Sequence, residues 1–261
     1  MSLRIFTSLY DERNPARLSE ILECLRRNAA LPETDTVCVF LEGNTKPKDC
    51  GANVEFRSIS YRPRYKDFFE WANEVVDSDA DISIICNSDI FFESTIGTLS
   101  ASLRPNQCAA LARWDMQPNG FAKLLDRNDS QDAWVFRGRL RSINCDFLMG
   151  IPRCDNRLLH ELTASGYQVI NPAFSIRCIH LHAGQREEYP SKIEGLHVDP
   201  PYAYLWPHNL LSLPKTAFIN VMHPSKRVRW RLDYRRLAAS LPARIFKRFM
   251  RTLFRARTHS S

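Results

Sequence analysis

The stretch Asp81-Ile-Ser-Ile-Ile-Cys-Asn-Ser-Asp89 decides the fold. Its centre, Ile82 to Cys86, is a continuous apolar run, which is typical of a strand that is covered on both faces. In open α/β sheets, ligands bind at the carboxyl ends of the strands. Asn87, Ser88 and Asp89 follow the strand and therefore lie at the end where a ligand binds. The acidic residues that precede the strand, 77–81, lie at the opposite end and are expected to form a solvated loop.

Strand and helix patterns alternate on the N-terminal side of this stretch. The elements predicted from apolar runs and helical spacing are strands at 3–10, 37–41 and 54–56 and helices that begin at Pro15 and span 65–76. This alternation predicts an α/β fold, with a mixed but mostly parallel sheet flanked by helices on both faces. The middle of the chain is less regular. Residues 115–131 are predicted to form a polar loop, and 174–182 a strand.

Composition and charge restrict the class of protein. Hydrophobic residues make up 44% of the chain and charged residues 25%, as in soluble globular proteins. No apolar run approaches the roughly 18 residues of a membrane-spanning helix, and the N-terminus lacks the features of a signal peptide. The eight cysteines form no C-x-x-C pair, which argues against zinc-ribbon and thioredoxin-like sites. A cytoplasmic protein with reduced thiols is expected.

The positive charge is concentrated near the C-terminus. Residues 226–257 contain twelve Lys or Arg and one Asp, a net charge of +11, so the rest of a chain of net charge +7 carries −4. Apolar residues repeat at helical spacing on one side of this segment, which predicts a basic amphipathic helix. We expect a domain at 1–225 and a tail at 226–261 that binds an anionic membrane surface, placing the protein at the inner face of the membrane. Nucleic acid is a less favoured partner, because the acidic body offers no basic groove.

The segment Asn87-Ser88-Asp89-Ile, followed by Phe-Phe and a helix, resembles the D-x-D element of GT-A-type glycosyltransferases, in the nucleotide-diphospho-sugar transferase superfamily. The resemblance covers about residues 3–185. It implies metal-dependent sugar transfer from a nucleotide-diphosphate donor to a hydroxyl of a glycan or lipid-linked glycan. Asp89 would bind Mn²⁺ or Mg²⁺, which neutralises the leaving group. Asn87 and Ser88 would contact the donor, although Asn in place of the first Asp removes one charge.

Two carboxylates are candidates for the base that deprotonates the acceptor hydroxyl. The segment from Cys154 to Tyr167 resembles the helix of inverting GT-A enzymes that begins with an acidic residue and ends in Gly-Tyr, which implies Asp155. An Asp at this position is also a good helix cap. Asp132, in Ser-Gln-Asp-Ala-Trp, is the alternative base, and Trp134 would hold the sugar. Inversion at the sugar is expected if either residue is the base.

The remaining candidates follow from the same resemblance. His180 and His182 lie on one face of a predicted strand, and one of them would complete the metal shell, with His182 favoured. The other residues expected to line the nucleotide sugar are Thr7, Ser8, Tyr10, Glu42, Arg62 and Arg64.

Three other functions share part of this pattern. A sugar nucleotidyltransferase would have a glycine-rich loop after the first strand, whereas the first glycine here is Gly43. A non-catalytic protein that binds carbohydrate or nucleotide sugar would need neither a metal ligand nor a base. A metal-dependent phosphoesterase needs more clustered carboxylates and histidines than occur near Asp89.

Overall fold

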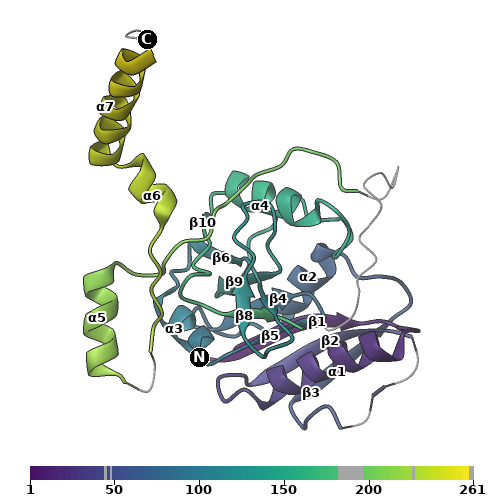
Figure 1. Cartoon of the computed structure of the whole chain (residues 1–261). Helices are drawn as coiled ribbons and strands as arrows, with labels where there is room; N and C mark the ends of the chain where they lie inside the picture. The colour runs from purple at the N-terminus through teal and green to yellow at the C-terminus, as the bar shows by residue number, and fades with distance from the viewer. Residues whose placement is uncertain (44–45, 48, 182–196, 225–226, 259–261) are drawn as a thin grey trace. The chain divides into compact units, whose positions relative to one another are not determined.

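The computed structural model of the chain describes residues 1–43, 46–47, 49–181, 197–224 and 227–258 (Figure 1). The chain divides into two compact units, Met1–Trp230 and Arg231–Ser261. The boundary expected from the sequence, between 225 and 226, falls on residues outside those described.

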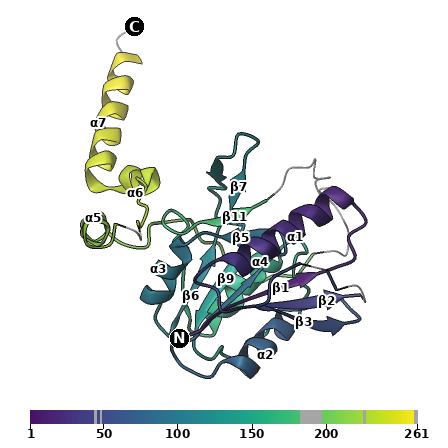
Figure 2. The same ribbon diagram turned by 90° about the horizontal axis from the view of Figure 1, so that it is seen from below.

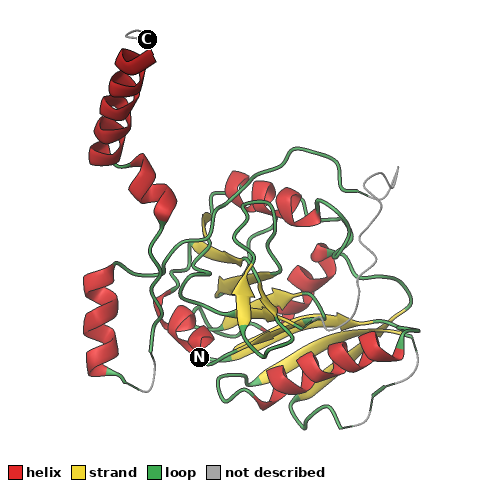
Figure 3. Cartoon of the chain, in the orientation of Figure 1, coloured by secondary structure: helices red, strands yellow, loops and turns green. Residues whose placement is uncertain are grey.

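A seven-stranded sheet forms the centre of the first unit, in the order β10-β6-β9-β4-β1-β2-β3. Figure 3 draws the strands in yellow and the helices around them in red. Its strands are β1 (Leu3–Leu9), β2 (Thr36–Glu42), β3 (Val54–Ile59), β4 (Ile82–Cys86), β6 (Gln107–Leu111), β9 (Ala133–Arg137) and β10 (Gln168–Ile170). Only β9 runs antiparallel to its neighbours β4 and β6; the other pairs are parallel. The predicted mixed, mostly parallel α/β sheet is therefore confirmed.

Helices cover both faces of this sheet. Successive strand residues point to opposite sides, and apolar residues on both sides are buried by these helices. Ile5 of β1 packs in the core cluster that contains residues of α1 (Pro15–Ala30) and α3 (Thr95–Ser102). Phe6 packs on the other side, with α2 (Tyr65–Val75) and α4 (Cys154–Ala164). Figure 2 shows α1 and α2 on opposite sides of β1 to β3.

A second, four-stranded sheet has the order β5-β11-β7-β8. Its strands are β5 (Ile90–Phe92), β7 (Trp114–Met116), β8 (Ala122–Leu124) and β11 (Cys178–His180). The prediction that 115–131 is a loop is therefore wrong, since it contains the antiparallel pair β7 and β8. Strands of three residues are too short to show a hydrophobic period. Within the segment predicted as a strand at 174–182, only 178–180 is assigned to one, and it pairs with both β5 and β7.

The strand order places a crevice beside β1. The chain continues from β1 to β2 and β3 on one side of β1, and β4 lies on the other side. In sheets of this kind the crevice opens at the carboxyl ends of the strands on either side of such a reversal. At the opposite end, Asp81 is not solvated as expected. It is buried, accepts the backbone N–H of Ser2 at 2.8 Å and pairs with Arg4.

Three helices follow the sheet along the sequence. Helix α5 (Leu213–Met222) belongs to the first unit, and α6 (Tyr234–Ala239) and α7 (Leu241–Thr258) belong to the second. The described part of the chain contains no helix that is both long and apolar enough to cross a membrane.

Candidate active site

Two adjoining cavities lie at the carboxyl edge of the central sheet. The smaller has a volume of about 110 Å³ and the larger about 670 Å³. Asn87, at the end of β4, and Gly150, before α4, line both cavities. Gly150 has a φ of +75°, and a Cβ added there would lie 2.8 Å from the Arg62 guanidinium. Glycine therefore permits both the left-handed backbone and the close approach of Arg62.

The smaller cavity gathers most of the residues predicted to bind the nucleotide sugar. They come from the ends of β1, β2 and β4 and from the loop before α2. Those that line it are Ser8, Tyr10, Glu42, Arg62, Asn87, Ser88 and Asp89. The structure thus brings together side chains that lie up to 81 positions apart in the sequence.

Three predicted donor contacts lie elsewhere. Thr7 is buried within β1 and lines neither of these cavities. Arg64 points to Asp146, whose Oδ1 accepts its Nη1 at 2.9 Å. Trp134 is fully buried, with its ring 6.5 Å from that of Tyr65 in an edge-on contact. With no exposed surface, Trp134 offers no ring face to a sugar in this structure, and its contact with the sugar stays a prediction.

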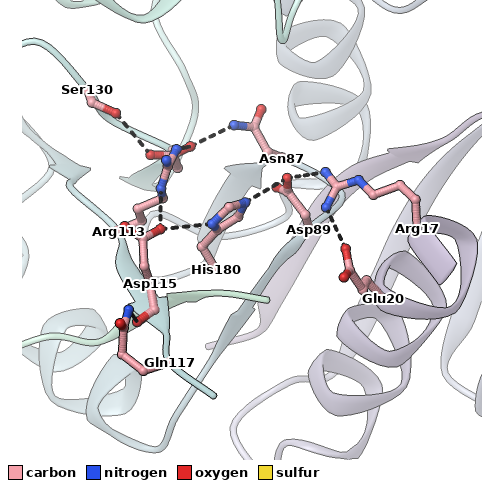
Figure 4. Close-up of polar contacts among 10 residues, drawn as sticks. Arg17, Glu20, Asn87, Asp89, Arg113, Asp115, Gln117, Ser130 and His180 are labelled. Carbon is pink, nitrogen blue, oxygen red and sulfur yellow. Dashed lines mark hydrogen bonds and ion pairs between the residues drawn. The ribbon is translucent and has the colours of Figure 1, made fainter. Parts of the chain in front are cut away.

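Asp89 is the centre of a buried polar cluster (Figure 4). Its Oδ2 accepts hydrogen bonds from Arg17 on α1 and from Nε2 of His180 on β11, the latter at 3.1 Å. Arg17 also donates to Glu20 at 3.0 Å. The Oδ1 atom of Asp89 is buried and has no hydrogen-bond partner among the described residues. This oxygen, on a residue that lines the smaller cavity, is available to a donor group of a ligand.

The cluster continues from His180 towards the larger cavity. Nδ1 of His180 lies 2.9 Å from Oδ1 of Asp115, which also accepts the Nε of Arg113 at 2.7 Å. Nη1 of Arg113 donates to Oδ1 of Asp132 at 3.3 Å, and Asn87 donates to the same oxygen at 3.0 Å. One network of alternating charges therefore connects the two cavities, as Figure 4 shows.

Burial and charge pull the pKa values of this cluster in opposite directions. Burial alone would raise the pKa of Asp89, but the hydrogen bond and charge of His180 and the charge of Arg17 hold it well below its usual range. Burial alone would lower the pKa of His180, but its hydrogen bonds to Asp115 and Asp89 raise it to about 9. His180 is therefore an imidazolium at neutral pH and donates from both nitrogens.

The described residues supply only part of the predicted Mn²⁺ or Mg²⁺ site. A histidine binds a metal through a nitrogen lone pair, and both nitrogens of His180 face carboxylates. The prediction that His180 is a ligand is therefore not supported. His182, the favoured ligand, lies outside the described residues. Among the described residues no group of three or more His, Cys, Asp or Glu could hold a metal ion, and Asp89 supplies one unpaired oxygen.

The two candidate bases line the larger cavity but differ in their partners. Both oxygens of Asp132 are engaged, Oδ1 by Arg113 and Asn87 and Oδ2 by the hydroxyl of Ser130 at 3.4 Å. Asp155 accepts only backbone N–H groups, from its neighbour Asn156 at 2.9 Å and from Gln131 at 3.3 Å. No cation pairs with it in the described part of the chain.

Asp155 has the electrostatics of a base that works near neutral pH. Burial and the negative charge of Asp132 raise the pKa of Asp155 to about 6. Asp155 lies in the first turn of α4, where the helix dipole favours a negative charge. It is not the N-cap, however, because the helix begins at Cys154 and Arg153 occupies the cap position with a φ of +71°.

Sequence reasoning missed three residues of the cluster, Arg17, Arg113 and Asp115. Arg17 lies in the first turn of α1, directly after the β1 loop, and Arg113 follows β6. Both therefore occur at carboxyl ends of parallel strands, the position that identified Asp89. The same rule, applied to every strand instead of β4 alone, would have found them.

Comparisons with known proteins give the following results. No family model and no curated protein matches the sequence. The structure is similar to a mannosyltransferase from Pyrobaculum calidifontis in complex with GDP-Man and Mn²⁺, with a TM-score of 0.44, 12% identity, and coverage of 72% of this chain and 58% of that chain. The chain thus spans less than two thirds of that protein.

Two further solved structures represent two kinds of enzyme. A 2-C-methyl-D-erythritol 4-phosphate cytidylyltransferase from Francisella tularensis has a TM-score of 0.37 and 15% identity over 52% of this chain and 73% of that one. The galactosyltransferase LgtC, in complex with donor and acceptor sugar analogs, has a TM-score of 0.32 and 15% identity over 51% and 57%. These values identify neither activity nor substrate, so the function is argued from the site.

Proposed function

We propose that the protein is a glycosyltransferase that moves a sugar from a nucleotide-diphosphate donor to a hydroxyl of a glycan or lipid-linked glycan. The observation that carries this proposal is the pair of adjoining cavities. One collects the expected donor-binding residues, and the other contains a carboxylate with a pKa raised to about 6. A transferase needs two substrates in contact, and the cavities meet at Asn87 and Gly150.

In this proposal the smaller cavity holds the diphosphate of the donor. Arg17 and Arg62 line it together with Glu42 and Asp89, and the two guanidinium groups stay charged at every working pH. Charge-assisted hydrogen bonds from guanidinium groups suit phosphate oxygens. As the bond between the sugar and the diphosphate breaks, negative charge grows on the leaving oxygen, and these groups stabilise it.

Asp155 then acts as the base. The acceptor hydroxyl gives its proton to the Asp155 carboxylate while its oxygen forms the bond to the sugar carbon, and the nucleoside diphosphate departs with the electrons of the broken bond. A hydroxyl that attacks from the side opposite the diphosphate inverts the configuration of the sugar carbon. Asp132 is better suited to positioning, because Arg113 and Asn87 occupy its Oδ1.

The central experiment is a thermal-shift screen of the full chain with nucleoside diphosphates and their sugar conjugates. A ligand at 100 times its Kd stabilises a folded protein by about 2.7 kcal/mol, which for a unit of this size raises Tm by about 5 to 10 °C. We expect one nucleoside diphosphate to give such a shift. Stabilisation by a nucleoside triphosphate alone would indicate a nucleotidyltransferase, and no shift with any nucleotide would contradict the proposal.

The same screen, run with Mn²⁺ and with a chelator, tests the predicted metal. Asp89, through its unpaired Oδ1, would be one ligand of a bound ion. A shift that requires Mn²⁺ would make His182, outside the described residues, the candidate second ligand. A shift in Tm of equal size in the presence of chelator would indicate that Arg17 and Arg62 bind the diphosphate without a metal ion.

We also propose that α7 binds an anionic membrane surface near a lipid-linked acceptor. Its apolar side chains Leu241, Ile245, Phe246 and Phe249 are each more than half exposed, and Arg244, Lys247 and Arg248 are exposed among them. An amphipathic helix of this kind lies in the interface, with its apolar face among the acyl chains.

Charge reversal in the full chain tests the membrane surface. Each basic side chain near an anionic surface contributes about 1 kcal/mol, so Lys247→Glu with Arg248→Glu should weaken binding to phosphatidylglycerol vesicles at least about thirtyfold. Arg57→Glu with Lys66→Glu makes the same change in charge on the first unit and is the matched control. Equal loss in both double variants, measured by vesicle flotation, would refute a specific role for α7.

A further inference from the structure

An extended segment runs beside the larger cavity and is fixed to its rim. Residues 201–209 form neither helix nor strand, and Figure 1 shows the chain passing α4 on its way to α5. The backbone N–H of Ala203 donates to the carbonyl of Asn156 at 3.0 Å, and that of Leu205 donates to the carbonyl of Asn128 at 2.8 Å. Asn156 lines the larger cavity, so the segment has a defined place at its edge.

The side chains of this segment alternate as they do in a strand. Ala203 and Leu205 pack on the core between β4 and α4. Tyr204 and Trp206 take the other side and are 52% and 47% exposed. Tyr202 belongs to the same alternating set and is half-buried. In extended backbone, alternate residues are about 6 to 7 Å apart, so the three aromatic side chains form a row.

The first member of the row connects it to the larger cavity. The hydroxyl of Tyr202 donates to the carbonyl of Val198 at 2.5 Å, which holds the ring in place. The guanidinium of Arg153 lies 5.6 Å from the centre of this ring. Arg153 lines the larger cavity beside Asp155. The aromatic row therefore leads towards the proposed base.

The chemistry of the row and of the cavity suits a carbohydrate. Tyr and Trp offer an apolar, electron-rich face with a polar group at one end. A pyranose ring offers C–H groups on its face, which stack on such a ring, and hydroxyls around its edge. The Oε1 atom of Gln131, which lines the cavity, is buried and has no hydrogen-bond partner in the part of the chain that the structure describes. The Nε2 atom of Gln131 donates to the carbonyl of Asn128 at 3.3 Å. A buried carbonyl oxygen without a hydrogen-bond partner is suited to accept a hydrogen bond from a sugar hydroxyl.

We infer that Tyr202, Tyr204 and Trp206 form a stacking surface for successive sugar units of an acceptor glycan, whose terminal unit enters the larger cavity and hydrogen-bonds Gln131. This inference rests on the proposed function and narrows the acceptor to a chain of at least two or three sugars. A monosaccharide bound in the cavity would leave the aromatic row uncovered.

The test uses the full chain and an array of oligosaccharides, followed by calorimetry on a series of increasing length for each glycan that binds. Affinity is expected to rise from one sugar unit to three. Tyr204→Ala and Trp206→Ala should each weaken the longest glycan at least about fivefold, and Trp206→Phe should retain most of the affinity. Phe121→Ala is the matched control, because Phe121 is 75% exposed and lines neither cavity.

The outcomes separate this inference from the proposed function. Both alanine substitutions are at exposed positions, and circular dichroism confirms that the variants fold. Affinity that is unchanged in both variants, or an array on which no glycan binds, overturns the inference, while a nucleotide-dependent shift in Tm keeps the proposed function. Glycan binding that depends on Tyr204 and Trp206, in a protein that binds no nucleotide, supports the aromatic surface and refutes sugar transfer.

Discussion

Replacing Asp155 with Asn is expected to lower kcat by about 10² to 10⁴-fold, the usual contribution of a general base. Asn has nearly the same shape, but its single carbonyl oxygen can accept only one of the two backbone N–H groups, of Asn156 and Gln131, that the two Asp155 oxygens accept, and it takes up no proton. The measurement is release of nucleoside diphosphate from the donor that the thermal-shift screen identifies. KM for that donor should change little, because Asp155 lies in the larger cavity and not in the smaller one.

The pH dependence distinguishes a base from a positioning residue. With a pKa of about 6, Asp155 is protonated and inactive below that pH and becomes a base as the pH rises through it. Activity of the unmodified chain should therefore fall on the acid side with a midpoint near pH 6, and the residual activity of Asp155→Asn should lack this step. Asp146→Asn, an exposed carboxylate outside both cavities, is the matched control.

Asp132→Asn tests whether Asp132 is the base instead of Asp155. Its carboxylate faces Arg113 and Asn87, so its loss should disturb the geometry. It also removes a negative charge that raises the pKa of Asp155, so the acid limb should persist but move below pH 6. If instead the acid limb disappears in Asp132→Asn and persists in Asp155→Asn, the base is Asp132.

Replacing Trp134 with Ala is expected to reduce the free energy of unfolding by about 3 to 5 kcal/mol, the cost of removing a large aromatic side chain from a packed core. Trp134 has no exposed surface and lies in β9, between β4 and β6. Deleting the indole leaves a cavity that these paired strands cannot easily close. Chemical denaturation monitored by circular dichroism measures the loss.

Trp134→Phe separates packing from sugar binding. It keeps an aromatic ring at the site and should cost about 1 to 2 kcal/mol, with transfer activity retained at a temperature where the variant is folded. Tyr61→Ala, on the surface, should change stability by less than about 0.5 kcal/mol. A Trp134→Phe variant that is stable but no longer binds the sugar would support the predicted contact between Trp134 and the sugar.

The strand that decides the fold and the edge at which ligands bind could be predicted because each rests on local sequence. An apolar run bounded by polar residues identifies β4, and the direction of the chain identifies its carboxyl end. Placing Ser8, Glu42 and Asp89 together needed only the further assumption that parallel strands end at one edge. For this part of the site, the position of a residue at the end of its strand is enough to predict that it lies at the ligand-binding edge.

The rest depends on pairing between distant segments. Arg64 and Asp146 are 82 residues apart, and nothing near Arg64 in the sequence indicates that an acidic partner would turn it away from the smaller cavity. His180 meets Asp115 through β11 and β7, which have three residues each and no period to detect. Trp134 lies in a strand that is covered on both faces, so alternation could not say whether it faced a ligand or the core.

The reversed direction of β9 has a consequence for how the two substrates are held. This strand joins β10 and β6 on one side to β4, β1, β2 and β3 on the other. The smaller cavity is built from the ends of β1, β2 and β4, whereas Arg113 and Asp132 of the larger one come from the end of β6 and the start of β9. In the proposed function, the pairing of β9 with β4 would therefore set the alignment of donor with acceptor. A change in the twist of that one pair would shift one cavity against the other, and the shared residues Asn87 and Gly150 would be the first to move.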